Sequence, residues 1–371
     1  VEGGPDFELS RARSIAVLEF VPGNAIYANS GKYRVTYYHL PVGEERTEPV
    51  PLLVDWEAGL IRDKHGSKST DATYQDGRLV EISALAICDA EIAHLGRISD
   101  EEQNRFQLPV AVHGFLKNRH RGGKIFTVGD KSLQLRFGQE MRMVNLGPAD
   151  KVRRGELGFP VCTVCGAARS PYASQAEFDH FQDSHREKCH RQPERIALLA
   201  DATVDGAIFA GFDQLAHAVN LAEAIKIGAS QVLDTDQDDL QYFAWPESDG
   251  STGLFLYDPM SGGSGVLQQI VDHWSVVCEF AVELLGSCSC ESGCYRCIRT
   301  YRNLFYHRLL DRRTARDMVL HWNGAARFET AIPPMIGERL SQAGSEPNPK
   351  EQGLEQIDRK STRLNSSHES P

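Results

Sequence analysis

Four cysteines fall within ten residues near the C-terminal end of the chain, and this segment constrains the fold more than any other. The segment reads CSCESGCYRC, and its cysteines are Cys288, Cys290, Cys294 and Cys297. Four thiolates this close together can surround one tetrahedral Zn²⁺ at about 2.3 Å per bond. Four protein ligands leave no position for water, so the sequence predicts a structural zinc site. An iron–sulfur cluster is the main alternative because it also uses four cysteines, whereas disulfides between such near neighbours are strained.

A second group of metal-ligand residues lies in the middle of the chain. Its spacing is C-x2-C-x19-H-x3-C, formed by Cys162, Cys165, His185 and Cys189. This spacing is typical of zinc knuckles and ribbons, so we predict a second Zn²⁺ here. His180 or His190 could replace His185 as the nitrogen ligand. The alternative is a degraded half-site that is now only a surface loop.

Composition narrows the remaining possibilities. The formal net charge of −11 argues against a uniformly basic surface for nucleic acid but leaves room for a local basic face. Apolar runs are too short for a membrane helix and no signal-peptide core is present, so we expect a cytoplasmic protein with no membrane partner. Cys88 and Cys278 lie in apolar stretches and are expected to be buried. Because the chain starts at Val1, we expect a fragment of a longer protein.

Hydrophobic patterning predicts an α+β protein in four parts. We expect a β-rich accessory region over residues 12–157 and a zinc knuckle over 158–194. An α/β zinc-binding domain follows over 195–328, and its main feature is a long helix in which apolar residues recur at helical spacing from Leu267 to Leu285. A shorter helix before it is expected to be capped by Asp213 and to end at Gly228. Residues 329–371 read as a disordered tail, of which 360–371 look like translated sequencing adaptor.

Arginines and aromatic residues gather behind the four-cysteine segment. The segment from residue 291 to residue 317 contains seven arginines and only three acidic residues. Four aromatic residues lie among them. Single-stranded nucleic acid is bound by this combination, because cations hold phosphates and flat rings stack on bases. The candidates for phosphate contact are Arg299, Arg302 and Arg308, and the candidates for stacking are Tyr295 and Tyr301. Arg312 is left out because an ion pair with the adjacent Asp311 is expected.

No segment is suited to gripping ATP. The turn Gly262–Gly265 opens a helix but lacks the Lys-Ser/Thr pair of a P-loop. The chain therefore encodes no motor of its own. A nuclease using Asp234, Asp236 and Asp258 with Mg²⁺ is a weaker hypothesis, which metal-dependent cleavage of DNA would support.

The order of elements in the last third resembles the MrfA-like zinc-binding domain. This domain lies at the C-terminal end of the proteins in a group of superfamily-two DEAD/DEAH-box DNA helicases. The similar elements are the strand Leu254–Asp258, the turn Gly262–Gly265, a long helix, CSCESGCYRC, Tyr301–Asn303 and Leu310–Arg312. The N-terminal half is similar to the stretch that precedes this domain in the very large members of the group. The similar segments are Glu19–Asn24, Lys32–Val35, Arg97–Glu102 and Cys162–Gly166, and the resemblance covers roughly residues 15–325.

The resemblance implies a function for the whole region. It implies that two ATP-driven lobes lie upstream, that ATP binds only there, and that this chain is their C-terminal zinc-binding region. The implied partners are single-stranded DNA and the helicase motor, in cis or in trans, and the implied role is DNA repair or defence against foreign DNA. The alternative is a stand-alone interaction subunit that pairs with a separate helicase in phage defence. The upstream reading frame distinguishes the two.

Overall fold

The computed structural model describes residues 8–41, 48–64, 79–98, 106–118, 120–128, 131–260 and 262–324. They belong to one compact unit that extends to Glu329. The predicted tail at 329–371 and the predicted similarity at Ser99–Glu102 lie outside the described residues. The α+β class is confirmed, with a β-rich N-terminal part and a helical C-terminal region that holds the four-cysteine cluster. The expected boundaries at residues 157, 194 and 328 remain predictions.

Strands dominate the first half of the chain. Its elements are α1 (Arg13–Glu19), β1 (Ile26–Ala28), β2 (Gly31–Tyr38), β3 (Val50–Asp55), β4 (Leu60–Asp63), β5 (Val80–Ala86), β6 (Ala90–Arg97), β7 (Val110–Leu116), β8 (Gly122–Val128), β9 (Lys131–Pro148), α2 (Ala149–Val152) and β10 (Phe159–Val161). One sheet has the order β1-β2-β6. Its β1–β2 hairpin turns through Asn29 and Ser30, both at positive φ, which suits the twist of a two-residue hairpin turn.

The second sheet is organised around one long strand, β11 (Glu194–Phe212). Its path runs β12-β13-β11-β5-β3-β4, with β7, β8, β9 and β10 attached to it. The first residues of β11 pair with β10, its middle pairs with β5 and β9, and its last part pairs with β13. At the usual rise per residue, these 19 residues span about 60 Å. This strand therefore links the Cys162 segment to the region of the four cysteines.

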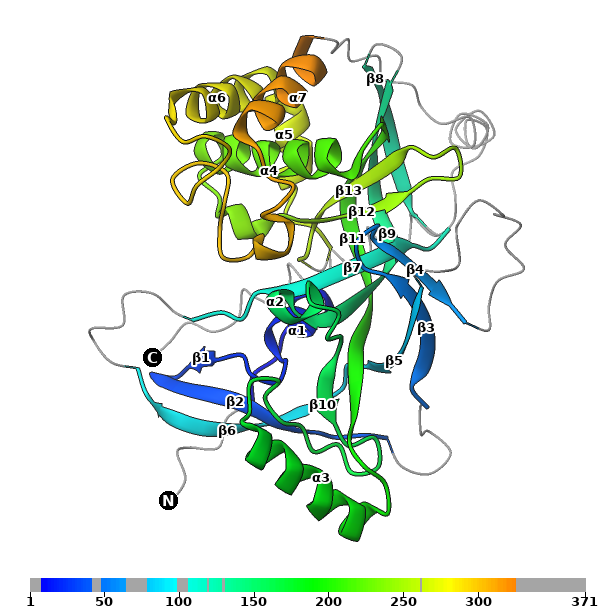
Figure 1. Cartoon of the computed structure of the whole chain (residues 1–371). Coiled ribbons are helices and arrows are strands. Elements are labelled where there is room, and N and C mark those ends of the chain that lie inside the picture. Colours follow the sequence, from blue (N-terminus) through cyan, green and yellow to red (C-terminus); the bar gives the residue numbers. More distant parts are fainter. Residues whose placement is uncertain are drawn as a thin grey trace, which may run out of the picture. The chain divides into compact units, whose positions relative to one another are not determined.

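The second half adds the helices. They are α3 (Gln175–Cys189), α4 (Leu215–Val232), α5 (Val266–Asp272), α6 (Trp274–Ser287) and α7 (Arg312–Gly324), with strands β12 (Gln241–Pro246) and β13 (Thr252–Asp258) and the 3-10 turns η3 (Gln237–Asp239) and η4 (Leu304–Tyr306). Figure 1 shows α4 to α7 gathered on one side of β12 and β13. They enclose one apolar core with α4 at its centre, because residues 218–229 of that helix are all buried. Among the described helices, none has the length and apolarity to cross a membrane.

Two helix predictions need correction. The stretch from Leu267 to Leu285 is two helices, because His273 leaves the helical region with φ −110° and ψ 24°. The helical spacing of apolar residues continues across His273, so the sequence pattern could not predict the break. In α4, the N-cap is Gln214 rather than Asp213, and Gly228 lies inside the helix. A Cβ at Gly228 would stand 2.1 Å from the carbonyl oxygen of Val277, so this glycine permits α6 to cross closely.

Candidate metal centres and nucleic-acid surface

The four cysteines of the C-terminal cluster are brought together by the loop that follows α6. The four sulfurs lie within 4.8 Å of one another. The Sγ–Sγ distances are 3.6 Å for Cys288–Cys294, 3.6 Å for Cys290–Cys297 and 3.7 Å for Cys294–Cys297. A tetrahedron with bonds of about 2.3 Å has edges of about 3.8 Å, so the set fits a single zinc ion. It is too wide for disulfides, at about 2.05 Å, and too narrow for a cluster that places each cysteine on its own iron.

The electrostatics of this loop also favour a bound cation. Burial raises the pKa of the Cys297 thiol to about 12, and it raises the pKa of Cys290 as well. The backbone N–H of Arg296 is the largest influence on Cys294 and lowers the pKa of its thiol to about 6. Adjacent thiolates repel one another, so ionising all four requires a positive charge between them. A zinc ion would supply that charge and hold the loop together.

The loop is tied to the surrounding helices through Arg312. Its Nε donates to the carbonyl of Cys290 at 2.7 Å and its guanidinium also donates to the carbonyl of Leu285 at 3.2 Å. The carboxylate of Asp311 instead caps α7 by accepting from the backbone N–H groups of Arg313 and Thr314, both at 2.9 Å. The predicted Asp311–Arg312 ion pair is therefore wrong. Arg312 does have a structural role, as expected, but its partners are the backbone carbonyls of Cys290 and Leu285 rather than a carboxylate.

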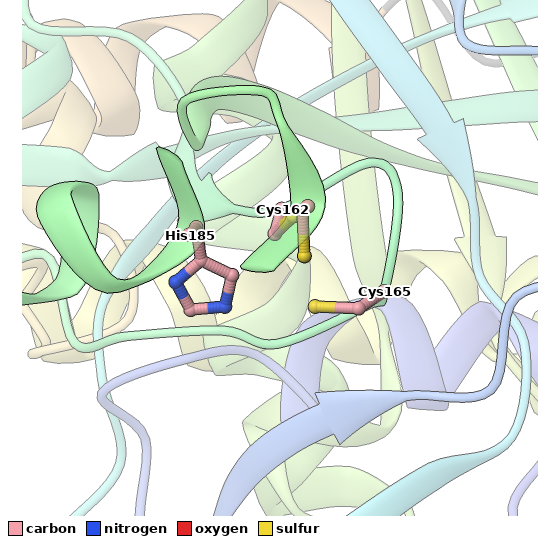
Figure 2. A group of neighbouring side chains, drawn as sticks. Cys162, Cys165 and His185 are labelled. Carbon is pink, nitrogen blue, oxygen red and sulfur yellow. The ribbon is translucent and has the colours of Figure 1, made fainter. Parts of the chain in front are cut away.

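The second cluster joins a turn after β10 to the last turns of α3. Cys162 and Cys165 come from the turn, and His185 and Cys189 lie one helical turn apart on α3, with all four ligand atoms within 4.8 Å. Figure 2 shows Cys162, Cys165 and His185 converging, with one ring nitrogen directed towards the Cys165 sulfur. His180 and His190 are not part of this group, so His185 is the histidine that accompanies the cysteines.

The orientation of His185 is fixed by a backbone hydrogen bond. Its Nδ1 lies 2.7 Å from the carbonyl oxygen of Phe181. A carbonyl oxygen can only accept, so Nδ1 carries the proton and Nε2 keeps its lone pair for a metal. Burial, together with the neighbouring thiols of Cys165 and Cys162, raises the pKa of Cys189 to about 12. As in the first cluster, the donor set fits one zinc ion.

The turn that carries Cys162 and Cys165 is anchored on β2. The backbone N–H of Tyr38 donates to the carbonyl of Gly166 at 2.8 Å, and that of Ala168 donates to the carbonyl of Thr36 at 2.9 Å. Gly166 has φ +89°, and a Cβ there would meet the Tyr38 oxygen at 1.9 Å. Only glycine can occupy this position without moving the backbone. The cluster is thereby attached to the three-stranded sheet.

The residues predicted to bind nucleic acid are only partly free. Tyr295 and Tyr301 are 59% and 72% exposed, and their rings lie side by side with centroids 5.3 Å apart. Arg308 is exposed. Arg302 forms an ion pair with Asp238 at 2.7 Å. Arg299 is half-buried and donates to the backbone carbonyl of His307 at 3.3 Å, so the sequence did not reveal the intramolecular partners of two of the arginines.

The glycine turn and the acidic residues have structural roles. Ser264 donates both its backbone N–H and its hydroxyl to Asp258, and the N–H of Met260 donates to the same carboxylate at 2.8 Å. This turn therefore directs the Ser264 N–H to a protein carboxylate. Among the described residues, only the two Cys/His clusters bring three or more ligand groups together, so Asp234, Asp236 and Asp258 form no such group.

One polar set was missed by the sequence reading. Glu223 and Lys226 are buried on α4 with their charged atoms 3.9 Å apart, and the Tyr242 hydroxyl donates to Glu223 at 2.8 Å. They line a small cavity of about 80 Å³ that Arg302 also borders. Two opposite charges at i, i+3 on an otherwise apolar helix were the available signal.

Comparisons with known proteins address the C-terminal region directly. Residues 221–298 match the model of the MrfA Zn-binding domain, and this range includes all four cysteines of the C-terminal cluster. The chain contains an MrfA Zn-binding domain. The matched range covers α4 from Leu221 onwards, the β12–β13 hairpin, α5, α6 and the cysteine loop. The MrfA Zn-binding domain here is therefore a helical layer on a hairpin that ends in the cysteine loop.

Longer proteins are also similar to this chain. Druantia protein DruE of Escherichia coli (strain UMEA 4076-1) is 22% identical over 381 residues, which cover 89% of this chain and 20% of that protein. A crystal structure of the DUF1998 helicase MrfA is 13% identical with a TM-score of 0.36, covering 78% of this chain and 30% of that one. The structure of MrfA bound to DNA is 12% identical with a TM-score of 0.32, covering 80% and 31%. The chain therefore spans about a fifth of DruE and under a third of MrfA.

Proposed function

We propose that this chain is the non-catalytic, zinc-binding C-terminal region of a DNA helicase, which holds a single DNA strand and braces an ATP-driven motor. The MrfA Zn-binding domain and the similarity to DruE support this assignment. The motor acts in cis if the chain is part of a longer protein and in trans if it is a separate subunit. The setting is cytoplasmic DNA repair or defence against foreign DNA.

The exposed pair Tyr295 and Tyr301 carries this proposal. Two large aromatic rings are expensive to leave in water, and here they lie beside each other in and just after the cysteine loop. Flat exposed rings are the surface on which bases of a single strand stack, at about 1–3 kcal/mol per base. Arg296 and Arg308 are exposed nearby in sequence and supply charge for phosphates. Arg299 and Arg302 have partners within the chain, and the tyrosine pair does not require them.

The metal supplies rigidity rather than chemistry. With four protein ligands, a zinc ion in the C-terminal cluster would have no open position for a substrate. Its effect is to fix the loop from Cys288 to Cys297, and so to fix Tyr295 between two ligands. The role in bracing the motor is supported by Val276 and Phe280, which lie one turn apart on α6 and are 42% and 45% exposed.

Fluorescence anisotropy with a labelled single-stranded oligonucleotide tests the proposal. The Tyr295→Ala/Tyr301→Ala variant is expected to lose at least tenfold in affinity, because each stacked base contributes about 1–3 kcal/mol. The Tyr295→Phe/Tyr301→Phe variant keeps both rings and should bind like the parent. Equal affinity of the alanine variant and the parent, with zinc content unchanged in both, would contradict strand binding at this surface.

Arg308→Ala tests the phosphate contact separately. We expect the slope of log affinity against log salt to decrease by about 0.7, the value for one phosphate contact with a single strand. Arg299 and Arg302 remain candidates, and an Arg302→Ala variant that binds like the parent would assign Arg302 to its ion pair with Asp238 alone. The upstream reading frame decides between a motor in cis and a motor in trans.

A further inference from the structure

We propose that a groove beside the second Cys/His cluster binds a phosphate group of a nucleic-acid backbone through Arg34 and Arg169. The groove has a volume of about 240 Å³ and lies between β2, the loop after Cys165 and the first turn of α3. The choice of nucleic acid as the source of the phosphate rests on the proposed function. The phosphate chemistry itself rests on the groove.

The two arginines reach the groove from segments that are hydrogen-bonded to each other. Arg34 is on β2, and Arg169 follows Ala168, whose N–H donates to the Thr36 carbonyl at 2.9 Å. β2 and the Cys162 turn thus form a continuous surface, and Arg34 and Arg169 both line the hollow between them. A planar guanidinium can donate two parallel hydrogen bonds to phosphate, so a pair of them is well suited to this ligand.

Neither arginine is neutralised by an ion pair with a described residue. Arg34 is exposed, and its charge acts on the Glu177 carboxylate without forming an ion pair among the described residues. The guanidinium of Arg169 lies over the Phe181 ring at 5.9 Å, and its Nε is buried without a hydrogen-bond partner among the described residues. A buried donor left without an acceptor is unfavourable by about 1–3 kcal/mol or more when it is charged. The guanidinium charge of Arg169 is therefore available to an anion in the groove.

The remaining charges of the groove do not cancel the arginines. Its acidic residue is Glu177, whose carboxylate is held at the start of α3 by the backbone N–H and the hydroxyl of Ser174, both at 2.9 Å. One carboxylate therefore faces two guanidinium groups, and the net charge is positive. The first turn of the 15-residue helix α3 adds the positive end of its dipole.

A nucleic-acid strand bound in this groove could also contact the tyrosine surface, which is formed by Tyr295 and Tyr301. Arg34 of the groove is on β2, and Arg302, next to Tyr301, lines a second hollow together with Ile26 and Tyr27 of β1, the strand that pairs with β2. Two separate contacts on one long strand increase the overall affinity without either being strong.

The experiment compares the zinc-loaded full chain with Arg34→Ala/Arg169→Ala by anisotropy over a range of salt concentrations. A long labelled oligonucleotide is used. We expect the salt slope to decrease by about 0.7–1.4, the value for one or two phosphate contacts. The control is Arg186→Ala/Arg191→Ala, which removes the same charge from the same part of the chain, at arginines that are paired with Asp183 and Glu194. Its salt slope should equal that of the parent.

Two further measurements keep the outcome decisive. Arg34→Ala alone removes an exposed side chain, so it should fold with full zinc content and still lower the slope. Titration with inorganic phosphate at constant ionic strength shows whether the free anion occupies the groove. Binding of inorganic phosphate that disappears in the double variant, with unchanged oligonucleotide slopes, would overturn the nucleic-acid source and assign the groove to a free phosphate. Unchanged slopes without phosphate binding would overturn the site altogether.

The outcome is independent of the tyrosine surface. Tyr295→Ala/Tyr301→Ala should lower affinity with little change in salt slope, because stacking releases no counterions. If that variant binds like the parent and the arginine variant does not, the proposed stacking surface fails and the groove stands. If the tyrosine variant loses affinity and the arginine variant binds like the parent, the groove proposal alone is overturned.

Discussion

The imidazole of His113 packs edge-on against the ring of Phe305, with centroids 5.3 Å apart and an interplanar angle of 77°. His113 is on β7 in the β-rich part, whereas Phe305 lies in η4, shortly after the cysteine loop. Burial lowers the pKa of His113 to about 4, with a smaller opposing effect from the backbone of Trp56. Neither ring nitrogen makes a hydrogen bond of good geometry within the described structure. The contact between these two parts of the chain therefore requires a neutral imidazole.

The first prediction follows from this pKa. An unfolded histidine titrates near pH 6.5, so the unfolded chain takes up a proton between pH 6.5 and 4 that the folded chain does not. The free energy of unfolding contributed by His113 is therefore present above pH 6.5 and is lost as the pH falls towards 4. Between pH 7.5 and 5, the parent should lose about 2 kcal/mol more than His113→Phe in urea unfolding. Exchange of the exposed His120 for Phe is the control, and equal losses in all three proteins would contradict the prediction.

The second prediction concerns metal content. We expect two zinc ions per chain by elemental analysis. Cys189→Ser should remove one of them, and Cys294→Ser should remove the other and unfold the MrfA Zn-binding domain, because the binding energy of a structural zinc contributes directly to folding. In the cobalt-substituted protein, tetrahedral ligand-field absorption should fall in each variant. Iron in the purified protein, with a brown colour, would contradict the zinc assignment.

The third prediction concerns Arg312. Its two hydrogen bonds to the carbonyls of Cys290 and Leu285 fix the cysteine loop against α6. Arg312→Ala should therefore release zinc to a chelator at least tenfold faster than the parent, since each lost hydrogen bond from a charged donor is worth about 1.5–3 kcal/mol. The neighbouring Arg313 is exposed, and Arg313→Ala should release zinc at the parental rate. A common release rate in the two variants would show that Arg312 does not hold the loop.

The fourth prediction compares two glycines inside helices. Gly228 of α4 faces the Val277 carbonyl so closely that a Cβ would overlap it, whereas a Cβ at Gly286 of α6 would have no neighbour closer than 3.9 Å. Gly228→Ala should destabilise the fold by about 1–3 kcal/mol through overpacking, and Gly286→Ala should stabilise it by about 0.5–1 kcal/mol through reduced backbone freedom. Thermal or urea unfolding measures both changes. The same sign of change for the two would be inconsistent with the α4–α6 crossing described here.

Local signals in the sequence were sufficient for several features. The spacing of cysteines within ten residues predicted the C-terminal cysteine cluster, because short loops leave their side chains little freedom to separate. The Cys162–Cys189 set was accessible for a related reason, since His185 and Cys189 at i, i+4 share one face of a helix. The β1–β2 hairpin also has a local cause, because Asn29 and Ser30 tolerate the backbone that its turn requires.

Partnerships between distant residues were decided only by the tertiary structure. Asp238 and Arg302 are far apart in sequence, so no local pattern could show that they form an ion pair. The same holds for Arg312 and the Cys290 carbonyl, and for Gly228 and Val277. The sequence by itself determined which side chains can bind metal and which surfaces carry rings and charge. Which arginines remain available for phosphate was decided by folding, because a charge is neutralised by whatever the rest of the chain places within a few ångströms of it.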